Sequence, residues 1–198
     1  MTITFEEMEF EHPDDFQTTE SRSGPAIVTK FGEFNFEYDP ARPVSAIVDS
    51  LLDDYHQRFP GKYRVVEETL EIDERSSTIF HIVPGASKDI SGAYVPRHSL
   101  LDVPVSVHFD HPAHVDTILC AVLEQASKLQ DTPLLCLTDF AHFFLGLVLY
   151  EYHAENVPAR TLLLRLLNET GHHLSWNVNR ASTKRDYAVV FYSAANGL

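Results

Sequence analysis

The stretch VPARTLLLRLLNETG, residues 157–171, decides the fold of the second half of this chain. Four leucines in it recur at the spacing of one helix face: Leu162, Leu163, Leu166 and Leu167. Pro158 suits the first turn of a helix, where its missing amide hydrogen costs nothing, and Gly171 can adopt the left-handed conformation that often ends one. The stretch therefore predicts an amphipathic helix that buries its leucine face.

On both sides of this helix, the polarity pattern predicts strands and one further helix. Leu174, Trp176 and Val178 alternate with polar residues, which is typical of a half-buried strand. The same reasoning predicts strands at 105–109, 133–138, 146–154 and 187–193, and a helix at 115–129. Residues 103–198 thus have the order β-α-β-β-α-β-β, which predicts a small domain of the α+β class.

The first hundred residues show a looser pattern. Phe34, Phe36 and Tyr38 alternate with polar residues and predict a half-buried strand, whose aromatic side chains are expected in the core, with a binding groove as the alternative. Helical spacing predicts a helix at 44–55, and strands are predicted at 63–66, 70–72 and 78–83. The predicted organisation is an acidic arm at 1–24 that starts as a strand fragment, a small β-α-β-β unit at 25–84, a linker at 85–102 and the α+β domain at 103–198.

The composition limits the function. The 198 residues include 29 acidic and 15 basic side chains, for a net charge of -14, and 44% are hydrophobic. This apolar content disfavours disorder, and the scattered basic residues disfavour binding to nucleic acid. No stretch is long and apolar enough to predict a membrane span. Because residues 1–100 hold 19 of the acidic side chains and only 9 basic ones, a partner chosen by charge is expected to be basic and to bind these first hundred residues.

The segment that ends the chain carries a family resemblance. Residues 158–167 (PARTLLLRLL), Gly171, residues 174–176 (LSW) and residues 187–191 (YAVVF) form a helix, a glycine and a hairpin. In this, residues 103–198 resemble the N-terminal domain of secretins and TonB-dependent receptors, the STN-like domain. The resemblance implies two helices held between two small sheets, a periplasmic location and a role in contacting other proteins.

Nearly the whole chain also resembles a group of uncharacterised exported bacterial proteins. The segments that carry this resemblance are ITFEE at 3–7, FNFEYDP at 34–40, FHIVP at 80–84, LLDVPVS at 100–106 and LSW at 174–176. The resemblance implies a periplasmic or secreted protein, with an export signal expected to precede this sequence, whose partner is another envelope protein. It implies no activity and no oligomeric state.

Cys120 and Cys136 are the two cysteines of the chain. Two cysteines this far apart suit neither a disulfide framework nor a metal knuckle. Since both lie in apolar surroundings, two separate buried thiols are the favoured interpretation. A disulfide between them stays open as the alternative in an oxidising compartment.

Histidine is unusually frequent, with 11 residues, and is densest in the segment HFDHPAH at 108–114. His108 and Asp110 are expected on the same face of a strand, with His111 and His114 at the turn into a helix. These four side chains are the candidate ligands for a divalent transition metal, although their spacing matches no established ligand pattern. The favoured alternative is a solvated turn in which Asp110 or His111 caps the helix, and His81, inside an apolar strand, is expected to be a structural histidine with a hydrogen bond.

No catalytic motif is found, so the chain is not predicted to be an enzyme. It contains no nucleophile elbow, no phosphate-binding glycine loop and no cysteine at an electropositive helix start. The loop predicted around Phe140, Phe143 and Phe144 is unusually apolar and is a candidate contact surface, although such residues belong more often to a core. The prediction is therefore a non-catalytic interaction module outside the cytoplasm, with a metal- or ligand-binding protein as the alternative.

Overall fold

The structure is a computed structural model, and it describes residues 2–22, 24–30, 35–72, 75–138, 145, 148–170, 174–180 and 186–193. The chain forms two compact units. Unit 1 contains Met1–Glu7, Glu67–His81 and Ser99–Leu198, and unit 2 contains Met8–Val66 and Ile82–His98. This division differs from the predicted one, because each unit combines segments that are far apart in the sequence.

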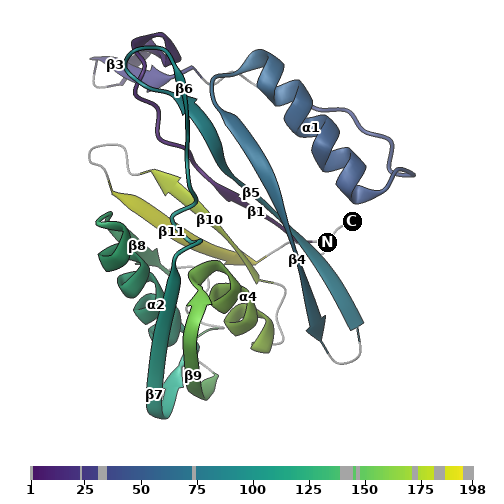
Figure 1. Cartoon of the computed structure of the whole chain (residues 1–198), viewed down its shortest axis with the longest axis vertical. Helices are drawn as coiled ribbons and strands as arrows, with labels where there is room; N and C mark the ends of the chain where they lie inside the picture. The colour runs from purple at the N-terminus through teal and green to yellow at the C-terminus, as the bar shows by residue number, and fades with distance from the viewer. Residues whose placement is uncertain are drawn as a thin grey trace. The chain divides into compact units, whose positions relative to one another are not determined.

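Unit 1 has mixed α+β structure (Figure 1). Its strands and helices are β1 (Thr2–Glu6), β7 (Pro104–His114), α2 (Val115–Gln130), β8 (Leu134–Leu137), β9 (Leu149–Pro158), α4 (Ala159–Glu169), β10 (Leu174–Arg180) and β11 (Tyr187–Ser193). Residues 67–72 of β4 (Lys62–Ile72) and 75–81 of β5 (Arg75–Lys88) also belong to this unit. From β7 to β11 this is the predicted order β-α-β-β-α-β-β, and the α+β class is confirmed.

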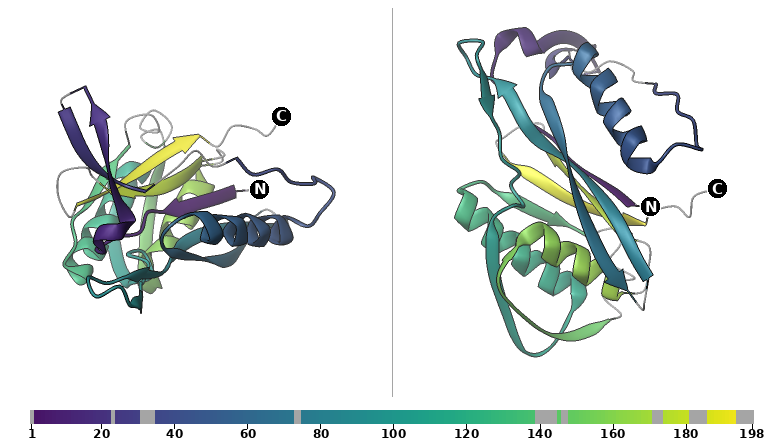
Figure 2. Two further views of the ribbon diagram at one scale, coloured as in Figure 1. Left: turned by 90° about the horizontal axis from the view of Figure 1, so that it is seen from above. Right: turned by 45° about the vertical axis from the view of Figure 1, so that its right-hand side comes forward.

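The strands of unit 1 form two sheets. The larger has the order β4-β5-β1-β10-β11-β8, and β7 pairs with β9 in a separate two-stranded sheet. Helices α2 and α4 pack against each other and contact strands of both sheets, α2 through β7 and β8 and α4 through β9 and β10 (Figures 1 and 2). The two helices therefore lie between the two sheets and can bury apolar side chains on both sides.

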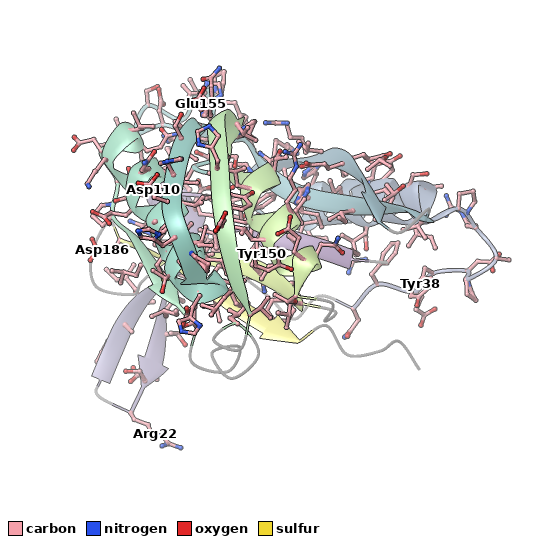
Figure 3. All side chains as sticks on the ribbon, turned by 90° about the horizontal axis from the view of Figure 1, so that it is seen from below. Arg22, Tyr38, Asp110, Tyr150, Glu155 and Asp186 are labelled. Atoms are coloured by element: carbon pink, nitrogen blue, oxygen red, sulfur yellow. A yellow bond between two sulfur atoms is a disulfide. The ribbon has the colours of Figure 1, made fainter. Side chains whose placement is uncertain are left out.

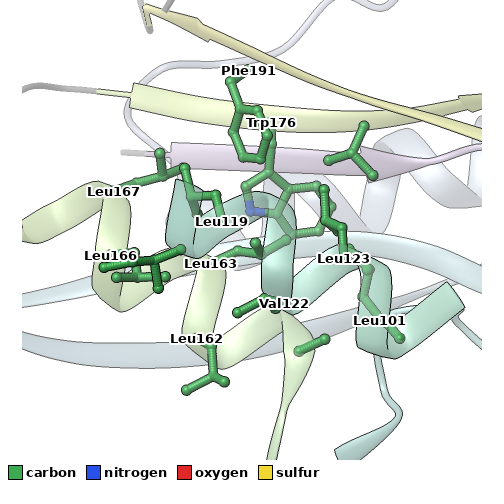
Figure 4. Close-up of a cluster of buried hydrophobic side chains, with 14 of the residues drawn as sticks. Leu101, Leu119, Val122, Leu123, Leu162, Leu163, Leu166, Leu167, Trp176 and Phe191 are labelled. Atoms are coloured by element: carbon green, nitrogen blue, oxygen red, sulfur yellow. The ribbon is translucent and has the colours of Figure 1, made fainter. Parts of the chain in front are cut away.

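The core of unit 1 is built from the helix faces that the sequence predicts (Figure 4). Leu119 and Val122 of α2 and Leu163 of α4 have no exposed surface, and neither do Trp176 of β10 and Phe191 of β11. Leu162, Leu166 and Leu167 are also buried. The leucine face of residues 157–171 is therefore a core-facing helix face, as its spacing predicts.

The first strand of the chain lies inside the larger sheet. β1 lies between β5 and β10 in the strand order and runs parallel to β10, with Phe5 opposite Asn177 and Glu6 opposite Val178. The predicted acidic arm at 1–24 therefore begins as a central strand of unit 1. The linker predicted at 85–102 also contains regular structure, because β5 continues to Lys88 and a short strand, β6 (Tyr94–Pro96), pairs with it.

Unit 2 contains the helix predicted at 44–55, which is confirmed as α1 (Val44–Arg58). It also contains residues 62–66 of β4 and residues 82–88 of β5. It also holds a 3-10 turn, η1 (Pro13–Asp15), and the hairpin of β2 (Phe16–Ser21) and β3 (Gly24–Thr29). Gly61 has a φ of +85°, and a Cβ there would lie 2.8 Å from the Phe10 ring, so the turn before β4 requires glycine.

The strand predicted from Phe34, Phe36 and Tyr38 is wrong over the residues that the structure describes. Residues 35–39 form no regular element, and Tyr38 is 60% exposed. The alternation of apolar and polar residues was not sufficient to predict a strand here, because residues 35–39 pair with no other strand and an unpaired strand is not stable. Among the described residues, no helix has both the length and the apolar character needed to cross a membrane.

Candidate functional site

The β7–β9 ribbon carries a cluster of exposed titratable side chains. His108 of β7 stands directly opposite His153 of β9 in the antiparallel register. The two Nδ1 atoms lie 2.6 Å apart, and the ring planes are nearly perpendicular, at 85°. Such a pair can form only where two strands meet in register, so the sequence around His108 alone does not predict it.

A carboxylate lies on the outer side of each imidazole. Asp110 Oδ1 is 2.5 Å from Nε2 of His108, and Glu155 Oε1 is 3.4 Å from Nε2 of His153. Figure 3 labels the two carboxylates, Asp110 on β7 and Glu155 on β9. The prediction that His108 and Asp110 point to the same face of a strand is confirmed. We name Asp110, His108, His153 and Glu155 the histidine relay.

The short contact between the two Nδ1 atoms is a hydrogen bond between the two rings. Two lone pairs at this distance repel each other and two N–H groups collide, so one proton must lie between the rings. On the outer side, a carboxylate can accept a hydrogen bond from an Nε2–H group that faces it. The two imidazoles therefore contact each other through Nδ1, and each faces a carboxylate through Nε2.

The other two predicted metal ligands have different positions. His114 is the residue that immediately precedes α2, but its side chain makes no capping hydrogen bond. His111 is exposed in the segment where the β7–β9 register shifts, between Phe109 and Ala113. The alternative in which Asp110 or His111 caps the helix is therefore wrong.

The four predicted ligands do not form a shared metal site. Over the part of the chain that the structure describes, no three or more His, Cys, Asp or Glu side chains are arranged to hold a metal ion. The sequence analysis did not identify His153 and Glu155 as candidate site residues. The signal that could have found them is a repeated pattern, since His108-Phe-Asp110 and His153-Ala-Glu155 both place a histidine two residues before an acid.

A second polar cluster is buried in unit 1. His81 has no exposed surface, its Nδ1 lies 2.6 Å from the Thr4 hydroxyl, and its ring stacks on Trp176. Burial, with a smaller contribution from Arg160, lowers the pKa of His81 to about 3, despite the Glu68 carboxylate 3.7 Å from Nε2. His81 is therefore neutral near pH 7 and is the hydrogen-bonded structural histidine that the sequence predicts.

The buried carboxylate of Glu6 holds the segment before β7. Ser99 donates a hydrogen bond of 2.5 Å to one Glu6 oxygen, and the backbone amide of Leu100 donates one of 2.6 Å to the other. Arg160, also buried, pairs with Asp102 and lies 3.4 Å from the Ser99 hydroxyl. These contacts satisfy groups that would be costly to bury alone, so the cluster is structural.

Cys120 of α2 and Cys136 of β8 form a disulfide, with their Cα atoms 5.4 Å apart. The favoured interpretation, two separate buried thiols, is wrong, and both residues are only half-buried. Sequence spacing could not decide between the two, because the distance depends on how β8 packs on α2.

β8 is the last strand in the order of the larger sheet. It pairs with β11 in parallel, and Leu135 and Leu137 are 47% and 40% exposed. The predicted contact loop at Phe140, Phe143 and Phe144 follows shortly after β8 and lies outside the residues that the structure describes.

Comparisons with protein-family models, with curated proteins and with solved structures found no match for this chain.

Proposed function

We propose that this protein is a non-catalytic interaction module that works outside the cytoplasm, and that it binds a partner protein by strand pairing at β8. The observation that carries the proposal is the position of β8 at an end of the sheet with two exposed leucines. An edge strand offers unpaired backbone groups to an extended peptide, and neighbouring side chains supply specificity.

Within its own four residues, β8 carries none of the usual protections of an edge strand against pairing. Natural edge strands are commonly guarded by lysine, by proline within the strand or by an inward-pointing charge. β8 has the sequence LLCL and contains none of these. Its apolar side chains on the exposed face, Leu135 and Leu137, suit a partner that covers them with apolar side chains of its own.

The disulfide supports a location outside the cytoplasm. Disulfides persist in oxidising compartments such as the periplasm and the extracellular space, and are rare in the cytosol. Cys120–Cys136 also fixes β8 to α2, so the edge is held in place before a partner binds. Such preorganisation lowers the entropic cost of association.

The arrangement of unit 1 supports the resemblance to the STN-like domain. That resemblance implies two helices between two small sheets, and α2 and α4 lie between the β7–β9 pair and the larger sheet. Domains of this kind in secretins and TonB-dependent receptors contact other envelope proteins. By the same reasoning the partner is an envelope protein, and the excess of acidic side chains in residues 1–100 favours a partner whose surface next to those residues is basic.

Site-specific photocrosslinking tests the proposal. A photoreactive amino acid is placed at Leu135 or at Leu137, and the protein is expressed in its native host from its full-length gene. We expect a discrete adduct from both positions in the envelope fraction. The matched control is Leu129, an equally apolar residue that is 60% exposed on α2 and lies off the β8 edge.

Two further measurements make the test decisive. Leu137→Glu in the chain that carries the crosslinker at Leu135 should remove the adduct, and higher salt should weaken it if the partner is basic. Equal adducts from Leu129 and Leu135, or recovery of the protein in the cytosolic fraction, would contradict the proposal.

A further inference from the structure

We propose that His108 and His153 form a two-histidine binding site for a divalent transition metal, with Cu²⁺ the preferred ion. The site is independent of the interaction proposed for β8. It replaces the predicted set of His108, Asp110, His111 and His114 with a pair of ligands that face each other across the β7–β9 ribbon.

The two proposed ligand atoms lie next to each other. The Nδ1 atoms of His108 and His153 lie 2.6 Å apart and face each other. Two imidazole nitrogens bound to one metal at about 2.0–2.1 Å are separated by roughly 2.9 Å in square-planar geometry and roughly 3.4 Å in tetrahedral geometry. To admit Cu²⁺, which favours the planar arrangement, the two nitrogens must separate by a few tenths of an ångström, and each ring must turn so that its lone pair points to an ion beside the line between them.

The outer nitrogens are already held as metal-bound histidines hold theirs. A histidine ligand almost always gives its other ring N–H to a carboxylate or carbonyl, which fixes the ring and strengthens the ligand. Asp110 takes this position on His108 at 2.5 Å, and Glu155 lies beside His153 at 3.4 Å. The histidine relay is thus symmetrical, with carboxylate, imidazole, imidazole and carboxylate in sequence.

Charge also favours a cation between the rings. A divalent ion that binds both Nδ1 atoms would displace the proton of the hydrogen bond between them. The ion would then carry a charge of two between the two carboxylates. Because both imidazoles are more than half exposed, with 57% of each side chain accessible, water can fill the remaining coordination positions.

Copper titration of untagged, disulfide-bonded protein tests the site. CuCl₂ is added at neutral pH, with binding followed by calorimetry and the ligands identified by electron paramagnetic resonance. We expect one tight equivalent of Cu²⁺ with the spectral signature of two imidazole nitrogens. Since binding competes with the shared proton, the affinity should fall as the pH is lowered.

Four variants identify the ligands. Asp110→Asn removes a carboxylate that holds a ligand and should weaken Cu²⁺ binding by roughly tenfold. His108→Ala and His153→Ala each remove a ligand itself and should weaken binding by more than about 100-fold. The matched control is the double variant His111→Ala/His114→Ala, which should bind Cu²⁺ as the parent does. Circular dichroism and Trp176 emission verify that each variant is folded.

Three outcomes would overturn the proposal. They are the absence of a tight equivalent in the parent protein, unchanged binding in the double variant His108→Ala/His153→Ala, and loss of binding in the His111→Ala/His114→Ala control. The last of these would return the site to the segment at 108–114.

Discussion

A disulfide joins Cys120 on α2 to Cys136 on β8, with their Cα atoms 5.4 Å apart. It links a helix to the strand at the end of the larger sheet. β8 has only four residues and one strand neighbour in the order of the sheet, so backbone pairing holds it weakly. The disulfide therefore adds a covalent anchor at the place where the larger sheet ends.

Reduction of this disulfide should destabilise the protein. A cross-link between residues 16 positions apart is worth about 3 kcal/mol in the chain-entropy description. Urea unfolding with and without a reductant should show the midpoint falling in the parent protein. The control is Cys120→Ala/Cys136→Ala, which should have the lower midpoint under both conditions, and a parent midpoint that ignores the reductant would contradict the prediction.

His81 should make the stability depend on acidity. Its pKa is about 3 in the folded protein, whereas the unfolded chain has the ordinary histidine pKa of 6.5. Between these values the unfolded state binds the extra proton, so stability is complete above pH 6.5 and is lost as the pH falls toward 3. The slope contributed by His81 is at most about 1.4 kcal/mol per pH unit.

The variant His81→Gln isolates this contribution, because glutamine can still accept a hydrogen bond from Thr4 but does not titrate. Its unfolding free energy, measured by urea at several pH values between about 4 and 7, should vary less steeply than that of the parent. His98→Gln, a change at an exposed histidine, should keep the parent slope. Parallel profiles for the parent and His81→Gln would refute the assignment.

Two leucines of α2 should respond very differently to truncation. Leu119 has no exposed surface, whereas Leu129 is 60% exposed on the same helix. Leu119→Ala should lower the free energy of unfolding by about 2–5 kcal/mol because it leaves a cavity, and Leu129→Ala should change it by less than about 0.5 kcal/mol. Thermal or chemical unfolding measures both, and similar losses would show that this helix face is assigned wrongly.

Substitution of Arg160 by alanine should lower the free energy of unfolding far more than the same change at Arg165, another arginine of α4. Arg160 is 3% exposed and pairs with Asp102, whereas Arg165 is exposed. Arg160→Ala should cost about 1–3 kcal/mol, since it removes a charged hydrogen-bond partner of Asp102, whose side chain is 39% exposed. Arg165→Ala should be nearly neutral in the same unfolding measurement, and a neutral Arg160→Ala would mean that Asp102 is solvated without it.

Local patterns predicted the elements with strong periodicity. The leucines at 162–167 and the alternation at 174–178 identified α4 and β10, because one helix or strand face must be apolar wherever it is buried. The alternation at Phe34, Phe36 and Tyr38 failed because residues 35–39 have no pairing strand. The candidate site was predicted in part, since His108 and Asp110 share one strand whereas His153 lies 45 residues away from His108.

The amino-acid sequence by itself therefore determined the α+β class, the element order from β7 to β11 and the faces of α2 and α4 that are buried. These follow from periods of about 3.6 and 2 residues, which are local properties of the chain. The tertiary structure alone decided that β1 enters the sheet between β5 and β10, that Cys120 meets Cys136 and that His108 faces His153. Each depends on which distant strands and helices pack together, and that choice depends on hydrogen bonding and burial summed over the whole unit.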